Sequence, residues 1–382
     1  ISLDALRCQA DLEPHLELMD RLSNSGLLDR RDEFLPSRKE VAARQPNRLL
    51  RPELSVLLAY SKMALFRGLL DEGLPAGPVT QNLLNSYFPQ QARERYPEML
   101  KKHPLADEIT ATVMTNHVID RAGSSFCQRI SRLSGASQAK VANSYLLLDH
   151  LLRAEEMRQA VFLLDNKISC QKQYHLLFEL EQILANSCLF LLSQELYLFR
   201  DAKDLQRLNL WLEEYVEALP MVLPAPVWQD CQQRKEELIT ASVPLFLAER
   251  FAILPQLKNF LPLLRLVSET KLEMGPLVRL SIEVLEKLSA EEILGGVENM
   301  PVHNNWDRSA REALLSSLRN ALFGIVQKIA LENNGDGQAF FHKEKQKYRS
   351  YRELREKLMR DDVTNFHPYT VLLRSLEALL GS

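Results

Sequence analysis

The stretch Arg51-Pro-Glu-Leu-Ser-Val-Leu-Leu-Ala-Tyr-Ser-Lys62 has the pattern of a helix with a defined start and one buried face. Pro52 suits the first turn of a helix, where its missing N–H would have no partner in any case. Leucines then recur at the spacing of one helical face, at positions 54, 57, 58, 65 and 69. We therefore predict a helix that begins at Pro52 and ends near Leu70.

A second stretch of the same kind begins at His103-Pro-Leu105 and ends with Asn116-His-Val-Ile-Asp-Arg-Ala-Gly-Ser-Ser-Phe126. Its apolar spacing predicts a long helix through Asp120. Whether the helix continues to Phe126 is open at this stage, because one glycine inside a strong helical pattern costs only about 1 kcal/mol.

The composition extends this helical pattern to the whole chain. Glycine is scarce, at 13 of 382 residues, and leucine dominates the apolar residues. The alternation of Val, Ile and Thr that indicates strands is hard to find. We predict an all-α protein, an orthogonal or antiparallel bundle of helices in two lobes, without a nucleotide-binding sheet.

Shorter signals predict where helices begin and break. Pro14 divides a helical pattern that runs from about residue 3 to residue 23. Ser37 with Glu40, and Ser289 with Glu292, have the spacing of capping boxes.

Three parts of the chain are predicted: a helical connector at 1–50, a first lobe at 51–220 and a second lobe at 227–382. Pro220, Pro224 and Pro226 mark the corner between the lobes. Residues 171–219 are predicted as an antiparallel helix pair broken near 199–202. The second lobe includes a charged helix near 343–360 and a C-terminal amphipathic helix from His367.

The two lobes show a faint internal echo. Arg129-Ile-Ser-Arg-Leu-Ser134 and Arg265-Leu-Val-Ser-Glu-Thr270 lie 136 positions apart, and each precedes a predicted helix. Chance similarity between leucine-rich helices is the default explanation, and a duplicated helical unit is the alternative.

Charge and cysteine content narrow the functional classes. The net charge of −3 gives no overall attraction to nucleic acid or to an anionic membrane. The five cysteines are widely spaced, with no Cys-x-x-Cys, as expected for reduced thiols in a cytoplasmic protein. The apolar run 183–192 is far shorter than the roughly 20 residues of a membrane span, so we expect no membrane segment. The first residue, Ile1, is expected to be either a cut in a longer polypeptide or the result of trimming at a disordered start.

The motifs of several common chemistries are missing together. The sequence has no Gly-x-Gly-x-x-Gly after a strand, no Gly-x-x-x-x-Gly-Lys-[Ser/Thr], no His-Glu-x-x-His and no Gly-x-Ser-x-Gly. We therefore predict no catalytic, cofactor-binding or metal-binding residue in this chain.

A few polar and aromatic residues remain as candidates for interface or structural roles. His117, Asp120 and Arg121 share one helix face, and they either meet a neighbouring domain or face water. No nucleophile stands beside them, so a catalytic role is disfavoured. Tryptophans are expected as core or interface anchors. The candidates are Arg51, Glu53, Lys62, Asn116, Asp120, Arg121 and Trp306.

Residues 343–360 form the most basic segment, with eight Lys or Arg against three Glu and with Tyr348 and Tyr351 interleaved. Such a segment can bind nucleic acid through phosphates and stacking. A solvated helix, or a helix that docks on an acidic surface, is the more common case, and nucleic acid is the disfavoured alternative here.

Several of these segments together resemble the C-terminal helical region of the large bacterial NAD-dependent glutamate dehydrogenases. The specific matches are Arg51 to Lys62, Tyr87-Phe-Pro89, His103-Pro-Leu105, Asn116 to Phe126 and Gly135-Ala-Ser137. The sequence departs from the family pattern at His117, where the family tends to have a smaller acidic or polar residue.

The resemblance implies a parent enzyme that converts L-glutamate, NAD and water to 2-oxoglutarate, ammonia and NADH. Such enzymes are cytoplasmic homo-oligomers of amino-acid catabolism. The resemblance also implies that the glutamate site, the catalytic lysine and the NAD site lie N-terminal to Ile1, in a catalytic domain that would be the partner of this chain.

Two further hypotheses compete with a non-catalytic structural, assembly or regulatory module of such an enzyme. The first is a free-standing helical scaffold that binds another protein. The second is nucleic-acid binding through the basic segment.

Overall fold

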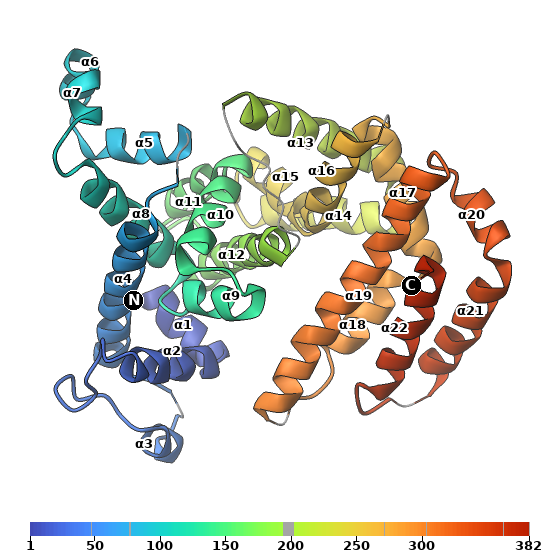
Figure 1. Cartoon of the computed structure of the whole chain (residues 1–382), viewed down its shortest axis with the longest axis horizontal. Helices are drawn as coiled ribbons and strands as arrows, with labels where there is room; N and C mark the ends of the chain where they lie inside the picture. The colour runs from blue at the N-terminus through green and yellow to red at the C-terminus, as the bar shows by residue number, and fades with distance from the viewer. Residues whose placement is uncertain are drawn as a thin grey trace. The chain divides into compact units, whose positions relative to one another are not determined.

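The computed structural model describes residues 1–46, 48–75, 78–193, 202–270, 272–302, 304–361 and 363–381. Every regular element in these ranges is a helix, so the all-α prediction is confirmed (Figure 1). No strand of a nucleotide-binding sheet occurs in the described ranges. The helices group into two compact units by their contacts: residues 1–209 with 232–258, and residues 210–231 with 259–382.

The first unit is built mainly from helices of the N-terminal two-thirds of the chain. They are α1 (Ser2–Ala10), α2 (Glu13–Asn24), α3 (Arg38–Ala43), α4 (Arg51–Glu72), α5 (Pro78–Tyr87), α6 (Gln90–Arg95), α7 (Pro97–Lys101), α8 (Ala106–Ala122), α9 (Phe126–Ser134), α10 (Gln138–Leu151), α11 (Ala154–Phe162), α12 (Cys170–Ser193), α14 (Ala225–Thr240), α15 (Leu245–Ile253) and the 3-10 helix η1 (Leu254–Asn259). Helix α13 (Ala202–Val222) begins in this unit and ends in the second, and α14 begins in the second unit and continues into the first from residue 232.

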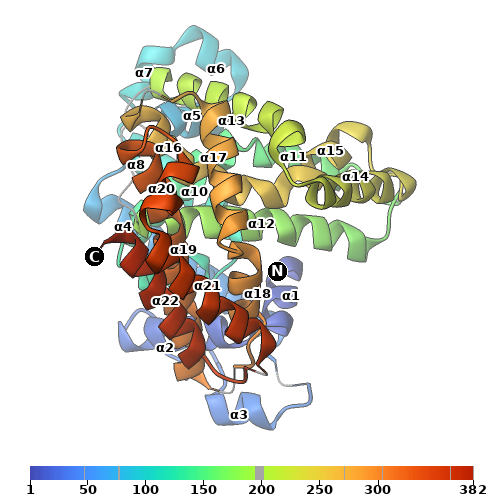
Figure 2. The same ribbon diagram turned by 90° about the vertical axis from the view of Figure 1, so that its right-hand side faces the viewer.

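The second unit contains α16 (Phe260–Glu269), α17 (Met274–Lys287), α18 (Ala290–Glu298), α19 (Asn305–Glu332), α20 (Gly337–Lys343), α21 (Lys345–Arg360) and α22 (His367–Leu380). Helix α22 packs against both α19 and α21, and the three run alongside one another in both views (Figures 1 and 2). Leucines of α22 at 372, 376 and 379 are buried there, as expected of the amphipathic C-terminal helix.

Helix α4 forms as its sequence predicts. Pro52 lies in the first turn, and the Leu50 N–H donates to the Glu53 carboxylate at 2.6 Å. Leu54, Leu57, Leu65 and Leu69 are fully buried, while Leu58 is half-buried. This apolar face packs against α2, α8 and α10 and places α4 in the core of the first unit.

Helix α8 ends at Ala122, so the possible continuation to Phe126 is wrong. Gly123 has φ +98°, a left-handed conformation that ends a helix and favours glycine. A Cβ at this position would lie 2.7 Å from the Asp4 carboxylate of α1. Asp4 accepts hydrogen bonds from the Ser124 N–H and hydroxyl, and Arg7 donates to the Arg121 carbonyl. The glycine therefore makes room for α1 to dock on the α8–α9 turn.

Of the other predicted helix boundaries, some are confirmed and some are wrong. The chain breaks between α1 and α2 before Pro14, and Ser37 with Glu40 forms a complete capping box, so both predictions are confirmed. The capping box at Ser289 is wrong, because its φ of +51° is left-handed and its side chain makes no cap hydrogen bond. Pro220 lies inside α13 and does not end it. The predicted break near 199–202 lies mostly outside the described residues, because residues 194–201 are not described. Helix α13 begins directly after them, at Ala202.

The boundary between the two contact units differs from the predicted boundary between the lobes at 51–220 and 227–382. Residues 210–220 group with the second unit, and residues 232–258 group with the first. Helix α13 crosses the boundary without a break, so prolines alone do not mark it. Whether the predicted connector and lobes fold as separate bodies stays a prediction.

The internal echo corresponds to two sets of four helices that pack in the same pairs, and the two middle helices of each set have matching lengths. Helices α10 and α17 each have 14 residues and begin at 138 and 274, 136 positions apart; α11 and α18 each have nine and begin at 154 and 290. Arg153 and Ser289, which precede α11 and α18, are both left-handed, with φ of +50° and +51°. The helix pairs that pack within α9–α12 recur within α16–α19. These agreements favour a duplicated four-helix unit over chance.

One helix in the described ranges, α12, is long and apolar enough to cross a membrane by length and composition alone. Half of its apolar window is buried inside the first unit, where α12 packs against α9, α10 and α11. Its middle also carries the buried carboxylate of Glu181. We interpret α12 as a helix of the protein core.

Candidate functional site

The most unusual feature of the first unit is a buried arginine, Arg158 of α11, whose side chain is 3% exposed. Its Nε donates to Glu181 of α12 at 2.7 Å, and its Nη2 donates to the Tyr145 hydroxyl of α10 at 2.7 Å. Its Nη1 donates to the Asp149 carboxylate and, at 3.4 Å, to Glu155. The Tyr145 hydroxyl in turn donates to Glu181 at 2.8 Å. Every polar end of this arginine therefore has a partner.

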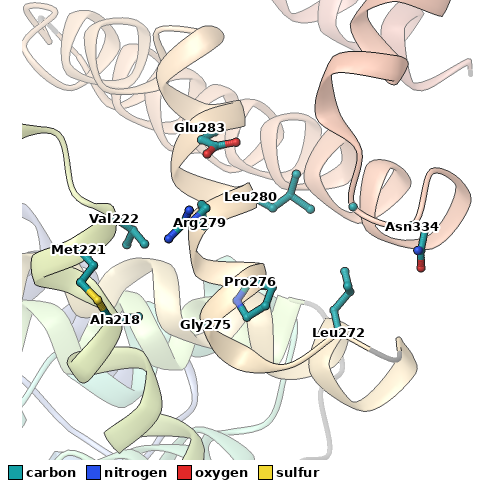
Figure 3. A pocket seen from close by; sticks show the side chains of 11 residues that line it. Ala218, Met221, Val222, Leu272, Gly275, Pro276, Arg279, Leu280, Glu283 and Asn334 are labelled. Carbon is teal, nitrogen blue, oxygen red and sulfur yellow. The ribbon is translucent and has the colours of Figure 1, made fainter.

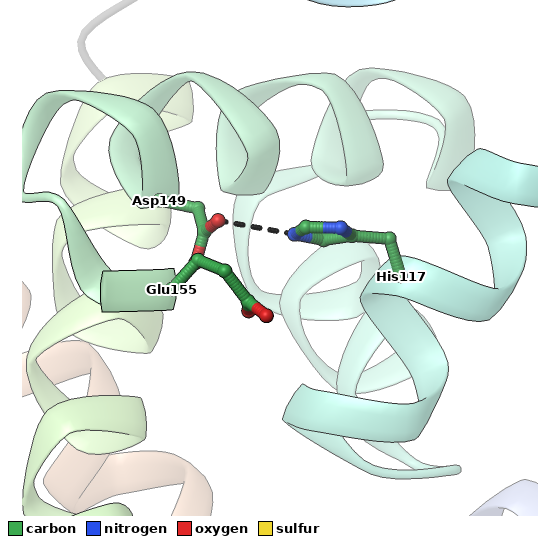
Figure 4. Close-up of side chains that lie close together, drawn as sticks. All are labelled: His117, Asp149 and Glu155. Atoms are coloured by element: carbon green, nitrogen blue, oxygen red, sulfur yellow. Dashed lines mark hydrogen bonds and ion pairs between the residues drawn. The ribbon is translucent and has the colours of Figure 1, made fainter. Parts of the chain in front are cut away.

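Helix α8 joins the same cluster from the other side. The His117 Nε2 lies 3.0 Å from the Asp149 carboxylate, as Figure 4 shows. The Arg121 Nε donates to Glu155 at 2.7 Å. We call the set His117, Arg121, Tyr145, Asp149, Glu155, Arg158 and Glu181 the Arg158 network. It ties together four helices, α8, α10, α11 and α12.

Helical spacing explains how these side chains converge. His117 and Arg121 are four residues apart on α8 and so share a face, as do Tyr145 and Asp149 on α10. Glu155 and Arg158 are three residues apart on α11. Because α10 packs against α8, α11 and α12, the polar faces of all four helices meet.

The charges of the network shift the protonation of its carboxylates. Burial by itself raises the pKa of Asp149, but the hydrogen bond to His117 and the charge of Arg158 outweigh it and lower this pKa below its ordinary value. Burial likewise opposes ionisation of Glu155, yet Arg121, Gln159 and Arg158 lower its pKa from 4.5 to about 2. Both carboxylates are therefore ionised at neutral pH.

Two buried members, Arg158 and Tyr145, keep their protons. Burial by itself lowers the pKa of Arg158, but the charge of Glu181 and the contacts with Asp149 raise it above its ordinary value. Burial, together with the charge of Glu181, raises the pKa of Tyr145 well above 10. The guanidinium stays charged and the phenol stays neutral, as their hydrogen bonds require.

His117, Asp149 and Glu155 offer ligand atoms within 4.8 Å of one another, a donor set that divalent metals use (Figure 4). However, Arg158 already donates to both carboxylates, and Arg121 donates to Glu155. A metal cation would have to displace two guanidinium groups from these oxygens. The arrangement fits a charge-compensated ion-pair network better than a metal centre.

The network also does not form the arrangement needed for nucleophilic catalysis. His117 and Asp149 have the geometry of a base and its orienting carboxylate, but no serine, threonine or cysteine in the described ranges hydrogen-bonds to His117. Cys127 and Cys188 are fully buried, and burial raises the pKa of both thiols, which makes them poor nucleophiles. The role that this arrangement supports is structural, since it holds four helices together.

The predicted interface residues are placed as follows. Lys62 of α4 and Asp120 of α8 form an ion pair at 2.7 Å between two helices. Glu53 pairs with Arg44 at 2.7 Å, and Arg51 donates to the Ser2 hydroxyl at 3.0 Å, so these two do not join Lys62 in one cluster.

Asn116 is exposed on α8, whereas Arg121 belongs to the Arg158 network. Trp306 is 86% exposed at the start of α19, which makes a core role for it wrong. The interface roles of these residues stay predictions.

Most of the basic segment forms helix α21 in the second unit, whereas Lys343 ends α20. Arg349 pairs with Glu353 and Arg352 with Glu356 along the helix, and Tyr351 is buried. These pairs reduce the charge available to a polyanion. Nucleic-acid binding stays a disfavoured hypothesis.

The sequence did not point to five members of the network, Tyr145, Asp149, Glu155, Arg158 and Glu181. One signal for Glu181 was present, because it interrupts an apolar helical face that is otherwise buried. The four-helix repeat gives a second signal. Ser281, Leu285 and Leu294 stand 136 positions after Tyr145, Asp149 and Arg158, so the second set of helices packs without these charges.

Comparison with known proteins gives consistent matches over most of the chain. The family model described as "Glutamate dehydrogenase, C-terminal" matches residues 46–378. The chain is 26% identical over 332 residues to the NAD-specific glutamate dehydrogenase of Halomonas elongata, which covers 86% of this chain and 20% of that protein.

Two further proteins of the same name give similar matches. The chain is 28% identical over 320 residues to that of Pseudomonas aeruginosa, covering 83% of this chain and 20% of the relative. It is 22% identical over 307 residues to that of Mycobacterium tuberculosis, covering 80% of this chain and 18% of the relative. The chain thus spans about a fifth of the length of these relatives.

Proposed function

Because the chain belongs to the glutamate dehydrogenase C-terminal family, we propose that it is the helical, non-catalytic part of a large NAD-dependent glutamate dehydrogenase. The family resemblance predicted from the sequence is confirmed by the match over residues 46–378. The observation that carries the proposal is the coverage. The chain matches only about a fifth of each named relative, so most of such a protein lies outside this region.

The helical fold supports placing the chemistry elsewhere. Oxidation of L-glutamate to 2-oxoglutarate and ammonia passes a hydride to NAD, and dinucleotides are commonly bound at the strand ends of a parallel sheet. The described ranges of this chain contain helices only. In the proposed parent enzyme, NAD and L-glutamate therefore bind in the remaining four-fifths of the polypeptide, and this chain binds no NAD.

Within that enzyme the chain serves a structural, assembly or regulatory role, with the catalytic part of the same polypeptide as its partner. The Arg158 network supports this role, since it makes the first unit a firmly connected support. The five cysteines are all free, which suits the cytoplasm. We also propose that the parent enzyme is a homo-oligomer.

The experiment compares the isolated chain with the intact parent enzyme in a glutamate-dependent assay for NADH. We expect the isolated chain to form no NADH and the parent enzyme to form it. A parent enzyme shortened by residues 46–378 is expected to lose stability or activity, because its catalytic part loses this support. NADH formation by the isolated chain, dependent on both L-glutamate and NAD, would overturn the proposal.

A further inference from the structure

The second unit contains a pocket of about 540 Å³ that the family assignment does not explain. Its walls come from the end of α13, from Leu272 and α17 as far as Glu283, and from the turn after α19 (Figure 3). Most of the lining is apolar, with Met221 and Val222 on one side and Leu272, Pro276 and Leu280 on the other. The volume lies in the range of small-molecule sites, roughly 300–1,000 Å³.

Two opposite charges stand on one wall of this pocket. Arg279 and Glu283 are four residues apart on α17, a spacing at which such side chains commonly pair. They pair neither with each other nor with any other charged side chain in the described ranges, and both are exposed. Figure 3 shows the Arg279 guanidinium directed toward the α13 wall, with Glu283 one turn further along α17. Both charges are therefore available to a ligand.

We propose that this pocket binds a free α-amino acid with an apolar side chain. Arg279 binds the α-carboxylate, because a guanidinium matches the two oxygens of that group. Glu283 accepts hydrogen bonds from the α-ammonium group, and the apolar wall of Met221 and Val222 takes the apolar side chain. An amino acid carries its two charges one carbon apart, so neighbouring side chains of opposite charge can hold both at once.

The same charges select against other small molecules. A dicarboxylate such as L-glutamate or a 2-oxo diacid would place its second negative charge among apolar groups, because Arg279 is the single cation among the lining residues that the structure describes. A simple fatty acid would satisfy Arg279 and leave Glu283 unpaired. A simple amine would pair with Glu283 and leave Arg279 unpaired. The selectivity for a zwitterion is what distinguishes this site from a general apolar groove.

Calorimetric titration of the intact chain tests the proposal with L-leucine as the probe. Two analogues each lack one charge: 4-methylpentanoate has no ammonium group, and 3-methylbutylamine has no carboxylate. We expect L-leucine to bind and each analogue, like L-glutamate, to bind about tenfold more weakly or worse, since a hydrogen bond to a charged group is lost. Equal binding of an analogue and of L-leucine would contradict the zwitterion site.

Variants locate the binding on the pocket. Arg279→Gln and Glu283→Gln are each expected to weaken L-leucine binding about tenfold or more. Glu286→Gln is the matched control, because Glu286 is exposed on the same helix outside the pocket, and binding should not change.

A filling variant separates loss of binding from loss of folding. Gly275 lines the pocket, and a Cβ added there meets no atom within 4 Å, so Gly275→Leu should fold and block the ligand. Urea unfolding of each variant verifies the fold. The proposal fails if L-leucine gives no binding heat with the unaltered chain, or if Gly275→Leu binds it as well. The test measures binding alone, so its outcome is independent of the proposed dehydrogenase reaction.

Discussion

Arg158 shows how a charged residue is accommodated inside a helical core. Its guanidinium, the Asp149 carboxylate and the Glu181 carboxylate are 3%, 6% and 9% exposed, and removing each ion from water costs several kcal/mol. Mutual hydrogen bonds offset this cost only while the set is complete. Leu294 occupies the corresponding position in the second unit, where the same helix arrangement forms without an arginine.

Removal of this single cation should therefore be costly. We expect Arg158→Leu to lower the free energy of unfolding by about 3–5 kcal/mol in urea titrations, because two buried carboxylates lose their partner. Replacing Asp149, Arg158 and Glu181 together by leucine should recover most of that loss. Arg265→Leu is the control, since its ion pair with Glu269 is exposed and is worth less than about 1 kcal/mol. A loss no larger for Arg158→Leu than for this control would contradict the role of the network.

Glu155 should make the network sensitive to acid. Its pKa is about 2 in the folded chain and close to its ordinary 4.5 in the unfolded chain. A lowered folded pKa contributes stability above the unfolded value, and that stability is lost as the pH falls from about 4.5 toward 2. We expect carboxyl NMR titration to give a midpoint near 2 for Glu155. Glu155→Gln should flatten the fall of the urea midpoint over this pH range, and an unchanged fall would count against the coupling.

At the scale of elements, helix starts depend on backbone conformation as much as on residue type. Ser37 and Ser137 have extended backbones and cap α3 and α10 through their hydroxyl groups. Ser289 has a left-handed backbone, so its hydroxyl does not cap α18 and instead accepts a hydrogen bond from Arg355 at 2.8 Å. The same left-handed backbone conformation recurs at Arg153, which precedes α11.

This recurrence gives a matched pair of substitutions. Glycine tolerates a left-handed backbone that costs other residues roughly 1–2 kcal/mol, so Arg153→Gly should raise the free energy of unfolding by about 0.5–1 kcal/mol. Ser289→Gly should gain less, because it also removes the acceptor of the Arg355 hydrogen bond. Urea titrations of the two variants measure the difference. A larger gain for Ser289→Gly would show that this hydrogen bond contributes nothing.

At the scale of the whole molecule, the contacts divide the chain into two units, and the Arg158 network lies wholly in the first. The pocket beside Arg279 lies wholly in the second. The two candidate features therefore depend on different parts of the core.

Because the two features lie in different units, we expect a destabilising substitution in one unit to affect mainly the helices of that unit. Regions with few shared contacts open independently, so Arg158→Leu should speed amide hydrogen exchange in α8 and α10–α12. Exchange in α17, α19 and α22 should stay within about twofold of the unaltered chain. Equal acceleration in both sets of helices would show that the units unfold as one.

Much of the helical framework could be predicted because its signals are local. The leucine spacing and Pro52 defined α4, and Ser37 with Glu40 defined the start of α3. One error arose where a distant contact changed a local preference, and another where a residue departed from its usual burial. Gly123 ends α8 to make room for Asp4, and Trp306 is exposed although tryptophan is usually buried at least in part. The resemblance of segments such as Arg51 to Lys62 and Asn116 to Phe126 anticipated the family, which the match over residues 46–378 confirms, but it could not reveal a network without a motif.

The amino-acid sequence by itself determined the helical class, the starts of α2, α3 and α4 and the family, because each rests on residues close together in the chain. Only the tertiary structure decided which charges meet. Arg158 lies 23 positions from Glu181, and His117 lies 32 positions from Asp149. Helical periodicity determines which face of its own helix a side chain lies on. The packing of separate helices determines which side chains of another helix it contacts. The buried network and the Arg279 pocket follow from that packing.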